Sequence, residues 1–195
     1  MDEPTNLYWP HFSEEEYARR DAKIRSAMRE EELDALIVYG VGGLIGTDPY
    51  QANVVYIARY AAFTQTYVVF PIEGEPTLFI PWDYQVANAK KITRLKDVRP
   101  GSLAQITDRV ADRLDELGLA SGRIGVVGAS LIHNISLPRE HFEILERRLP
   151  GAELPVVTRW FERIYMVKSE EEIAFIRRGA GMTDAVHEVL FQATR

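Results

Sequence analysis

The chain has 195 residues, of which 46% are hydrophobic and 27% charged, a balance typical of one folded globular domain with its own core. A formal net charge of −6 disfavours nucleic acid and anionic membranes as partners, and the lack of cysteine excludes disulfides, thiolate metal sites and cysteine nucleophiles. Because the acidic N-terminus carries no secretory signal and no long uncharged apolar run follows it, we expect a cytoplasmic protein without a membrane span.

The first predicted elements are a helix and a strand. Ser13 and Glu16 have the spacing of a capping box, which predicts a helix that continues to about Glu32. Its inward face is expected to carry Tyr17, Ile24 and Met28. Residues 33–39 form a short apolar run of strand length that ends at Gly40, so the helix should lead directly into a strand.

Three further strand patterns follow in the first half of the chain. Residues 53–57 read Asn-Val-Val-Tyr-Ile, a run rich in β-branched and aromatic side chains, and are predicted to form a strand. Residues 67–70 and 77–80 are separated by the turn sequence Glu-Gly-Glu-Pro at residues 73–76. This arrangement predicts an antiparallel hairpin.

Helices and strands alternate in the second half. Apolar residues recur every three to four positions from Leu103 to the glycine at 118, which predicts a helix with a glycine C-cap. A buried strand at 123–128, a helix at 138–149 and a strand at 153–157 are predicted next. Alternation together with the hairpin predicts an α/β fold, a three-layer α/β/α domain with a mixed parallel and antiparallel sheet.

A last helix is predicted to open at a second capping box, formed by Ser169 and Glu172. The side chains expected to point inward from it are Ile173, Ile176, Ala180 and Leu190. Because the sequence stops within this helical pattern, we expect the natural polypeptide to continue past Arg195.

The motifs of common catalytic and cofactor sites are incomplete in this chain. The glycines at 40, 42, 43 and 46 follow a strand, but Ile45 stands where a dinucleotide-binding loop needs glycine, so the 40–46 loop is interpreted as flexible or close to a ligand. Ser130 lacks the second glycine of a nucleophile elbow and is expected to be a loop or cap residue. The acidic runs that begin at Glu14 and Glu170 are explained by their position at helix N-termini.

The histidines do not form a metal-binding pattern. None has a second histidine four positions away with a nearby glutamate, as a zinc-binding helix requires. Each is therefore expected to be solvated or locally hydrogen-bonded. They are His11, His133, His141 and His187. We accordingly predict no metal ligand and no catalytic residue in this chain.

Four stretches together resemble the N-terminal domain of the creatinase, prolidase and aminopeptidase P family. They are the helix and strand of residues 17–39, the Asn-Val-Val-Tyr-Ile run at 53–57, the hairpin around Gly74, and residues 163–173. The last reads Arg-Ile-Tyr-Met-Val-Lys-Ser-Glu-Glu-Glu-Ile and is similar to the family's junction with its catalytic domain. The resemblance implies a creatinase/prolidase N-terminal-like domain over residues 1–166. Residues 167–195 would be the junction and the first helix of a catalytic "pita-bread" domain that lies downstream.

The resemblance also implies a function for the whole protein. In the family, two divalent metal ions (Mn, Zn or Co) are held by two aspartates, a histidine and two glutamates of the catalytic domain, so this chain alone is expected to be inactive. Its implied role is to support a homodimer, next to its own C-terminal catalytic domain, and to cover the active site of the partner subunit. The implied substrate is a small peptide or an amidino compound. The alternative is a stand-alone regulatory or small-molecule-binding α/β domain whose glycine loop holds the ligand.

Within that role, residues 60–67 resemble a creatinase stretch in which a phenylalanine and, two residues later, an arginine approach the neighbouring subunit's substrate. Phe63 matches the phenylalanine, whereas Gln65 replaces the arginine and cannot make its charged bidentate contact with a carboxylate. Asn53 and Tyr56 are the other candidates for residues close to substrate. The alternative reading makes Phe63 a core or interface residue and leaves Asn53 and Tyr56 as strand and turn residues without a ligand.

Overall fold

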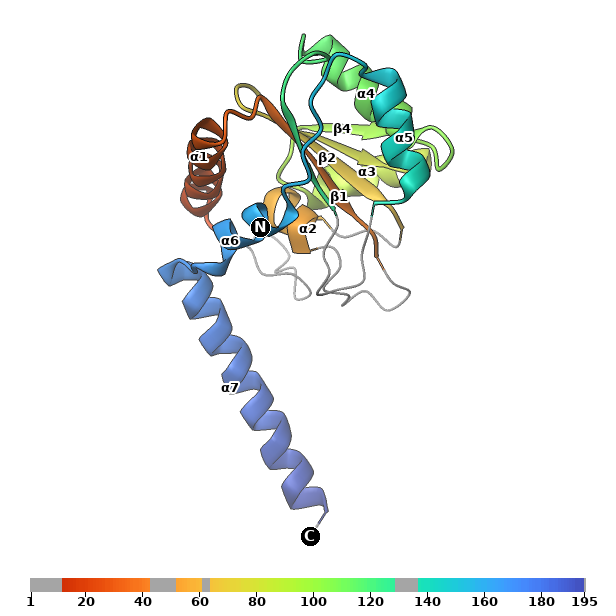
Figure 1. Cartoon of the computed structure of the whole chain (residues 1–195). Coiled ribbons are helices and arrows are strands. Elements are labelled where there is room, and N and C mark those ends of the chain that lie inside the picture. The colour runs from red at the N-terminus through yellow and green to blue at the C-terminus, as the bar shows by residue number, and fades with distance from the viewer. Residues whose placement is uncertain (1–11, 43–51, 61–63, 129–136, 195) are drawn as a thin grey trace.

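The computed structural model describes residues 12–42, 52–60, 64–128 and 137–194. Within these ranges the chain folds into one sheet with helices on both of its faces, and a last helix extends away from this body (Figure 1). The strands are β1 (Ala35–Gly40), β2 (Thr66–Pro71), β3 (Thr77–Ile80), β4 (Asp97–Pro100) and β5 (Ile124–Val127). The helices are α1 (Glu14–Glu30), α2 (Ala52–Ala58), α3 (Val86–Ile92), α4 (Ile106–Glu116), α5 (Arg139–Arg148), α6 (Thr158–Met166) and α7 (Glu170–Ala193), with a short 3-10 helix, η2, at Asp83–Gln85.

The sheet is mixed, as the sequence predicts. Its strand order is β4-β3-β2-β1-β5. Strand β2 pairs antiparallel with both β1 and β3, while β5 pairs parallel with β1 and β4 pairs parallel with β3. The β2–β3 pair is the predicted hairpin, so that prediction is confirmed.

Alternating side chains of the central strand β1 enter two separate cores. Leu36 and Val38 pack with residues of α1, α2, α3 and α6 on one face. Ile37 and Tyr39 pack with residues of α4 and α5 on the other face. Figure 1 shows α1 on one side of the sheet and α4 and α5 on the opposite side. The three-layer α/β/α prediction is therefore confirmed.

Helix α1 begins where the sequence predicts, but its cap differs from a complete capping box. The Ser13 hydroxyl accepts a hydrogen bond from the backbone N–H of Glu16, as expected of an N-cap. The Glu16 carboxylate does not return to Ser13; it binds Arg19 and Arg20 instead. The backbone N–H of Ser13 donates to Glu171 of α7 at 2.7 Å, so the start of α1 is tied to a residue far along the chain.

Residues 53–57 form part of helix α2, and the strand prediction for them is wrong. A short apolar run has no periodicity that separates a strand from a helix, and its β-branched residues favoured the strand. In the structure Val54, Ile57 and Ala58 are buried at helical spacing against α1 and the sheet. Tertiary packing therefore overrides local propensity here.

Residues 153–157 lie along β5 but do not form a named strand. They make two isolated parallel bridges, Arg123 with Glu153 and Val126 with Val156. Pro155 accepts from the Val126 N–H at 2.8 Å, but a proline has no N–H with which to extend the ladder. The strand predicted at 153–157 is therefore present only as two bridges along β5, and a regular strand does not form.

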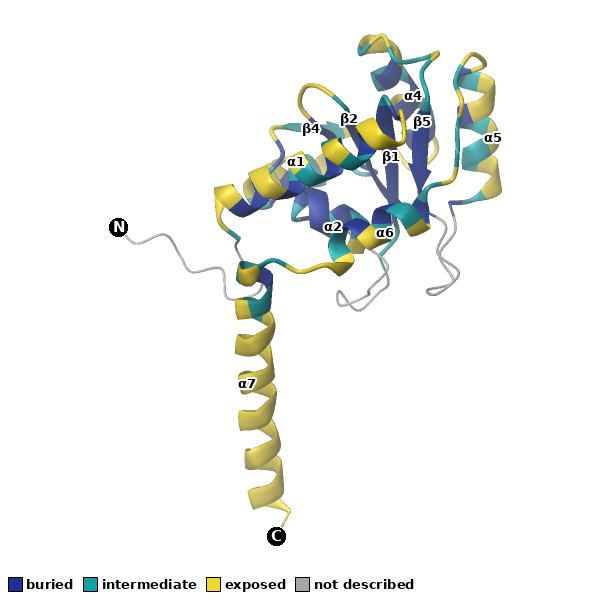
Figure 2. Cartoon of the chain, turned by 60° about the vertical axis from the view of Figure 1, so that its left-hand side comes forward, coloured by how far each residue is buried: buried dark blue, intermediate teal, exposed yellow. Residues whose placement is uncertain are grey.

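Helix α7 is solvent-exposed along most of its length (Figure 2). The capping box of Ser169 and Glu172 is present, with both reciprocal hydrogen bonds formed. The prediction that apolar residues of this helix point inward is wrong for this chain, because Ile176 is 57% exposed, Leu190 is 55% exposed and Ala180 is exposed too, while Ile173 is half-buried. In the part of the chain that the structure describes, no helix is both long enough and apolar enough to cross a membrane.

Candidate functional site

The structure places the predicted substrate-proximal residues in different surroundings. Gln65 lies directly before β2, and its side-chain amide donates to the carbonyl of Leu103 at 3.0 Å, ahead of α4. Tyr56 lies on α2, where its ring packs near Phe161 of α6 with a centroid distance of 6.4 Å. Phe63 lies outside the described residues. Gln65 and Tyr56 therefore have different neighbours, and no common site for them is formed by the described residues.

Two of these candidates carry buried polar atoms that lack a hydrogen-bond partner among the described residues. They are Oδ1 of Asn53 and the hydroxyl of Tyr56. Burial raises the pKa of Tyr56 to about 12, so its phenol is neutral at physiological pH. A neutral hydroxyl of this kind can donate to an acceptor but supplies no charge to a substrate.

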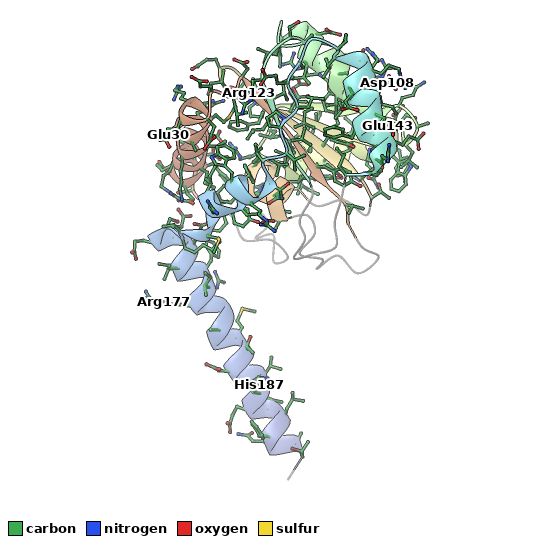
Figure 3. All side chains as sticks on the ribbon, in the orientation of Figure 1. Glu30, Asp108, Arg123, Glu143, Arg177 and His187 are labelled. Atoms are coloured by element: carbon green, nitrogen blue, oxygen red, sulfur yellow. The ribbon has the colours of Figure 1, made fainter. Side chains whose placement is uncertain are left out.

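The candidate residues of incomplete motifs are only partly described. Gly40 ends β1 and Gly42 follows it, whereas the rest of the 40–46 loop, together with His11, Ser130 and His133, lies outside the described residues. His187 lies on the exposed part of α7, away from the body of the domain (Figure 3). Within the described ranges, no group of three or more histidine or acidic side chains is arranged to hold a metal ion.

His141 is hydrogen-bonded to a buried tyrosine. The Tyr67 hydroxyl lies 2.6 Å from Nδ1 of His141, which links β2 to α5. Burial lowers the pKa of His141 and raises the pKa of Tyr67. Both groups are therefore favoured in their neutral forms, and the tautomer of the imidazole decides whether the hydroxyl or Nδ1–H is the donor. The sequence predicts a solvated or locally hydrogen-bonded histidine, whereas the bond observed joins His141 to a residue 74 positions earlier and connects two layers of the fold.

A shallow surface cavity of about 420 Å³ lies at the end of β4. Both acidic and basic side chains line it, among them Arg99, Arg109, Asp83 and Glu116. Arg99 is already bound to Glu116, with Nη1 2.8 Å from Oε2. The lining thus combines charges of both signs, and this mixture does not by itself select one class of ligand.

An extensively bonded cluster lies where α7 meets the body of the domain, and Arg20 of α1 is its centre. The Arg20 side chain is only 4% exposed. Its Nε donates to Oε1 of Glu16 at 2.8 Å, and its Nη2 donates to Oε1 of Glu172 at 2.9 Å. One guanidinium thus joins a carboxylate of α1 to a carboxylate of α7.

Neighbouring bonds reinforce the same contact between α1 and α7. The Ser13 hydroxyl donates to Glu171 at 2.7 Å, alongside the bond from the Ser13 backbone. The Lys23 ammonium donates to the carbonyls of Ile164 and Val167, at the end of α6 and just after it. Together these bonds fix the segment between α6 and α7 against α1.

The Glu16 carboxylate is held in its ionised form. Burial raises the pKa of Glu16, but hydrogen bonds from Arg19 and Arg20 outweigh this effect and lower the pKa to about 2. The Glu16 carboxylate therefore stays charged over the whole physiological pH range.

The sequence predicts capping-box roles for Glu16 and Glu172 but no specific role for Arg20. A signal was present, because Arg20 lies three residues after Tyr17 and four before Ile24, both on the buried face of α1. A charged residue on an apolar face needs a buried partner. Glu16, four residues earlier, is the partner within the helix.

Comparison with known proteins identifies the same family that four stretches of the sequence resemble. Residues 20–167 match the family model for the creatinase/prolidase N-terminal domain, which covers most of the chain. The chain belongs to this family. The four stretches that resemble the family, residues 17–39, 53–57, the β2–β3 hairpin around Gly74 and residues 163–173, all lie wholly or partly within the matched region.

Individual relatives of this creatinase/prolidase N-terminal domain are longer proteins. The chain is 27% identical over 184 residues to an uncharacterised hydrolase/peptidase, y4tM, of Sinorhizobium fredii, covering 89% of this chain and 44% of the relative. It is 25% identical over 193 residues to a creatinase of Bacillus sp., covering 95% and 42%. The dipeptidase PepE of Mycobacterium ulcerans shares the fold, with a TM-score of 0.63 at 23% identity over 92% of this chain and 44% of that structure. The chain thus spans less than half the length of each of these relatives.

Proposed function

We propose that this chain is the non-catalytic N-terminal domain of a metal-dependent hydrolase, an Xaa-Pro peptidase or creatinase-like enzyme. In this proposal it supports a homodimer and covers the active site of the partner subunit. Family membership and the greater length of the relatives support the proposal. The two divalent metal ions and their ligands would belong to a domain that follows residues 167–195. The substrate would be a small peptide or an amidino compound, and the location cytoplasmic.

The observation that carries the proposal is the exposed apolar surface of α7. From Ile176 onward every described residue of this helix is exposed. Large apolar side chains that are more than half exposed along it are Ile176, Met182, Val186, Val189, Leu190 and Phe191. Apolar surface of this extent on a helix is normally covered by another part of the protein or by a partner. A following domain that packs against α7 would bury these side chains.

The first test is to read the coding sequence past Arg195. Two aspartates, one histidine and two glutamates in the family order, about one domain length further on, would support the proposal. The longer protein should then hydrolyse an Xaa-Pro dipeptide or an amidino substrate in the presence of Mn²⁺, Zn²⁺ or Co²⁺. A reading frame that ends at Arg195 would contradict it and favour a stand-alone regulatory or small-molecule-binding domain.

A subunit-mixing experiment tests whether the domain covers the partner's active site. One full-length variant carries Phe63→Ala and Gln65→Ala, and a second carries alanine at one metal-ligating aspartate. If each active site uses Phe63 and Gln65 of the other subunit, mixing the two variants restores up to one functional site per mixed dimer. Mixed dimers with no more activity than either parent would exclude this role for the two residues.

A further inference from the structure

We infer that Arg20 is a positioning residue that fixes the direction of α7 relative to the sheet, by binding Glu16 of α1 and Glu172 of α7 together in a buried cluster. The positioning of α7 by Arg20 does not depend on the proposed function, but its functional consequence rests on that proposal. If a catalytic domain follows α7, Arg20 sets where that domain stands relative to this one.

The guanidinium of Arg20 binds both carboxylates in a fixed geometry. Its two carboxylate contacts, to Glu16 at 2.8 Å and to Glu172 at 2.9 Å, use different nitrogens of one planar group. The donor directions of arginine are fixed in that plane. Glu172 can therefore be bound in a narrow range of positions relative to Glu16, which belongs to α1.

Aromatic rings hold the guanidinium itself in place. The Cζ atom of Arg20 lies 4.2 Å from the ring centroid of Phe12, 4.5 Å from that of Tyr56 and 5.4 Å from that of Tyr17. Cations are attracted to ring faces within such distances. Tyr17 lies on α1 and Tyr56 on α2, so these two rings anchor the cation in the body of the domain, while Phe12 precedes α1.

The second carboxylate is equally constrained. Oε1 of Glu172 accepts from Arg20, and Oε2 accepts from the backbone N–H of Ser169, which closes the cap of α7. The preceding residue, Glu171, accepts two bonds from Ser13. Consecutive residues of the first turn of α7 are thus bound to α1 or to the residue that caps it, which restricts rotation as well as translation of the helix.

A small change in direction at the base of α7 produces a large displacement at its far end. Beyond the first turn, Phe175 contacts Phe12 with a ring-centroid distance of 4.7 Å, and from Ile176 onward α7 is exposed. The direction of this helix of 24 residues is therefore set at its base. At 1.5 Å per residue such a helix is about 36 Å long, so a tilt of about 10° at the base moves its far end by about 6 Å.

The test measures the direction of α7 in this chain. Since the chain has no cysteine, the double substitution Asp115→Cys and Asp184→Cys places one spin label on α4 and one on α7. A second pair, Glu75→Cys with Asp115→Cys, reports on the body alone. Distance distributions from double electron–electron resonance are compared for the parent, Glu172→Leu and Arg20→Met. The matched control is Glu170→Leu, which replaces an exposed glutamate of the same helical turn.

We expect a narrow 115–184 distribution in the parent and in Glu170→Leu, and at least a twofold broader one in Glu172→Leu and Arg20→Met. The 75–115 distribution should stay unchanged in all of them, which separates positioning from general stability. A 115–184 distribution as narrow in Glu172→Leu as in the parent would overturn the inference. If Arg20→Met fails to fold, Glu172→Leu decides alone. No activity is measured, so the outcome is independent of whether the proposed hydrolase function holds.

Discussion

Nη2 of Arg20 and Oε1 of Glu172 are 2.9 Å apart although 152 residues separate them in the sequence. Their side chains are 4% and 9% exposed. Burial of such a pair costs desolvation energy that only well-formed bonds offset. Here both partners have additional bonds, Arg20 to Glu16 and Glu172 to the backbone of Ser169. The contact therefore joins the first helix, α1, to the first turn of the last helix, α7.

Replacement of Arg20 should strongly destabilise the domain. Arg20→Met removes the buried cation that binds Glu16 and Glu172 and leaves them only Arg19, which is 40% exposed and lies 3.6 Å from Glu172. Loss of one partner from a buried pair typically costs about 3–5 kcal/mol, and the remaining contacts with Arg19 place the expected loss toward the lower end. The matched control is Arg29→Met on the same helix, whose pair with Glu73 is exposed, and there we expect a change within about 1 kcal/mol. Urea unfolding followed by circular dichroism gives both values. Equal losses in the two variants would show that the buried cluster contributes no more than a surface ion pair.

The stability of the domain should fall in acid partly through Glu16. Its pKa is lowered from 4.5 to about 2 in the folded state, so the unfolded chain takes up the proton first. The contribution of the ionised Glu16 carboxylate to the unfolding free energy is complete above about pH 4.5 and is lost as the pH falls toward 2. Glu16→Gln should therefore make the unfolding free energy less dependent on pH in this window. An unchanged slope in the variant, measured by urea unfolding at several pH values, would contradict the assignment.

The sequence predicts the architecture well because most of its elements have strong local patterns. Turn residues around Gly74 separate the two apolar runs of the β2–β3 hairpin, and Ser169 with Glu172 defines the start of α7. In both places the local sequence and the tertiary structure favour the same conformation. Helix α2 differs, because the short run at residues 53–57 is compatible with either a strand or a helix. Packing against α1 favours the helix.

The junction cluster could be predicted only in part. The spacing of Glu16 and Arg20 indicates a pair on one helix, and their position on an apolar face indicates burial. No local pattern connects them to Glu172, since that contact depends on where α6 returns the chain to α1. The residues near substrate were predicted from a resemblance, and the described structure gives Gln65 and Tyr56 separate neighbours.

The Tyr67–His141 hydrogen bond should be measurable in solution. Burial lowers the pKa of His141, so the neutral imidazole is favoured in the folded chain. Its contribution to stability is present above about pH 6.5 and declines as the pH falls below the pKa of the unfolded chain. Tyr67→Phe removes the hydroxyl and with it the hydrogen bond, which should cost about 1 kcal/mol at neutral pH. Tyr84→Phe, at a side chain that is 73% exposed, serves as the control and should have little effect.

An NMR titration checks the pH part of this prediction directly. The imidazole resonances of His141 should titrate below pH 6.5 in the folded protein. A midpoint at or above the ordinary histidine value would contradict the burial of this ring between α5 and β2.

Substitution by alanine should destabilise the protein at one glycine and stabilise it at another. A Cβ atom on Gly125, in β5, would lie 2.7 Å from Cγ2 of Val157 and 2.8 Å from Cδ2 of Leu36, so Gly125→Ala forces core side chains to move and should cost about 1–3 kcal/mol. A Cβ atom on Gly179, within α7, would meet nothing within 4 Å. Because alanine is favoured over glycine in a helix by about 1 kcal/mol, Gly179→Ala should stabilise α7 and raise the helical signal in circular dichroism. A loss of helical signal in Gly179→Ala would mean that α7 is packed against something in solution, since only a neighbouring surface could reject a methyl group at this position.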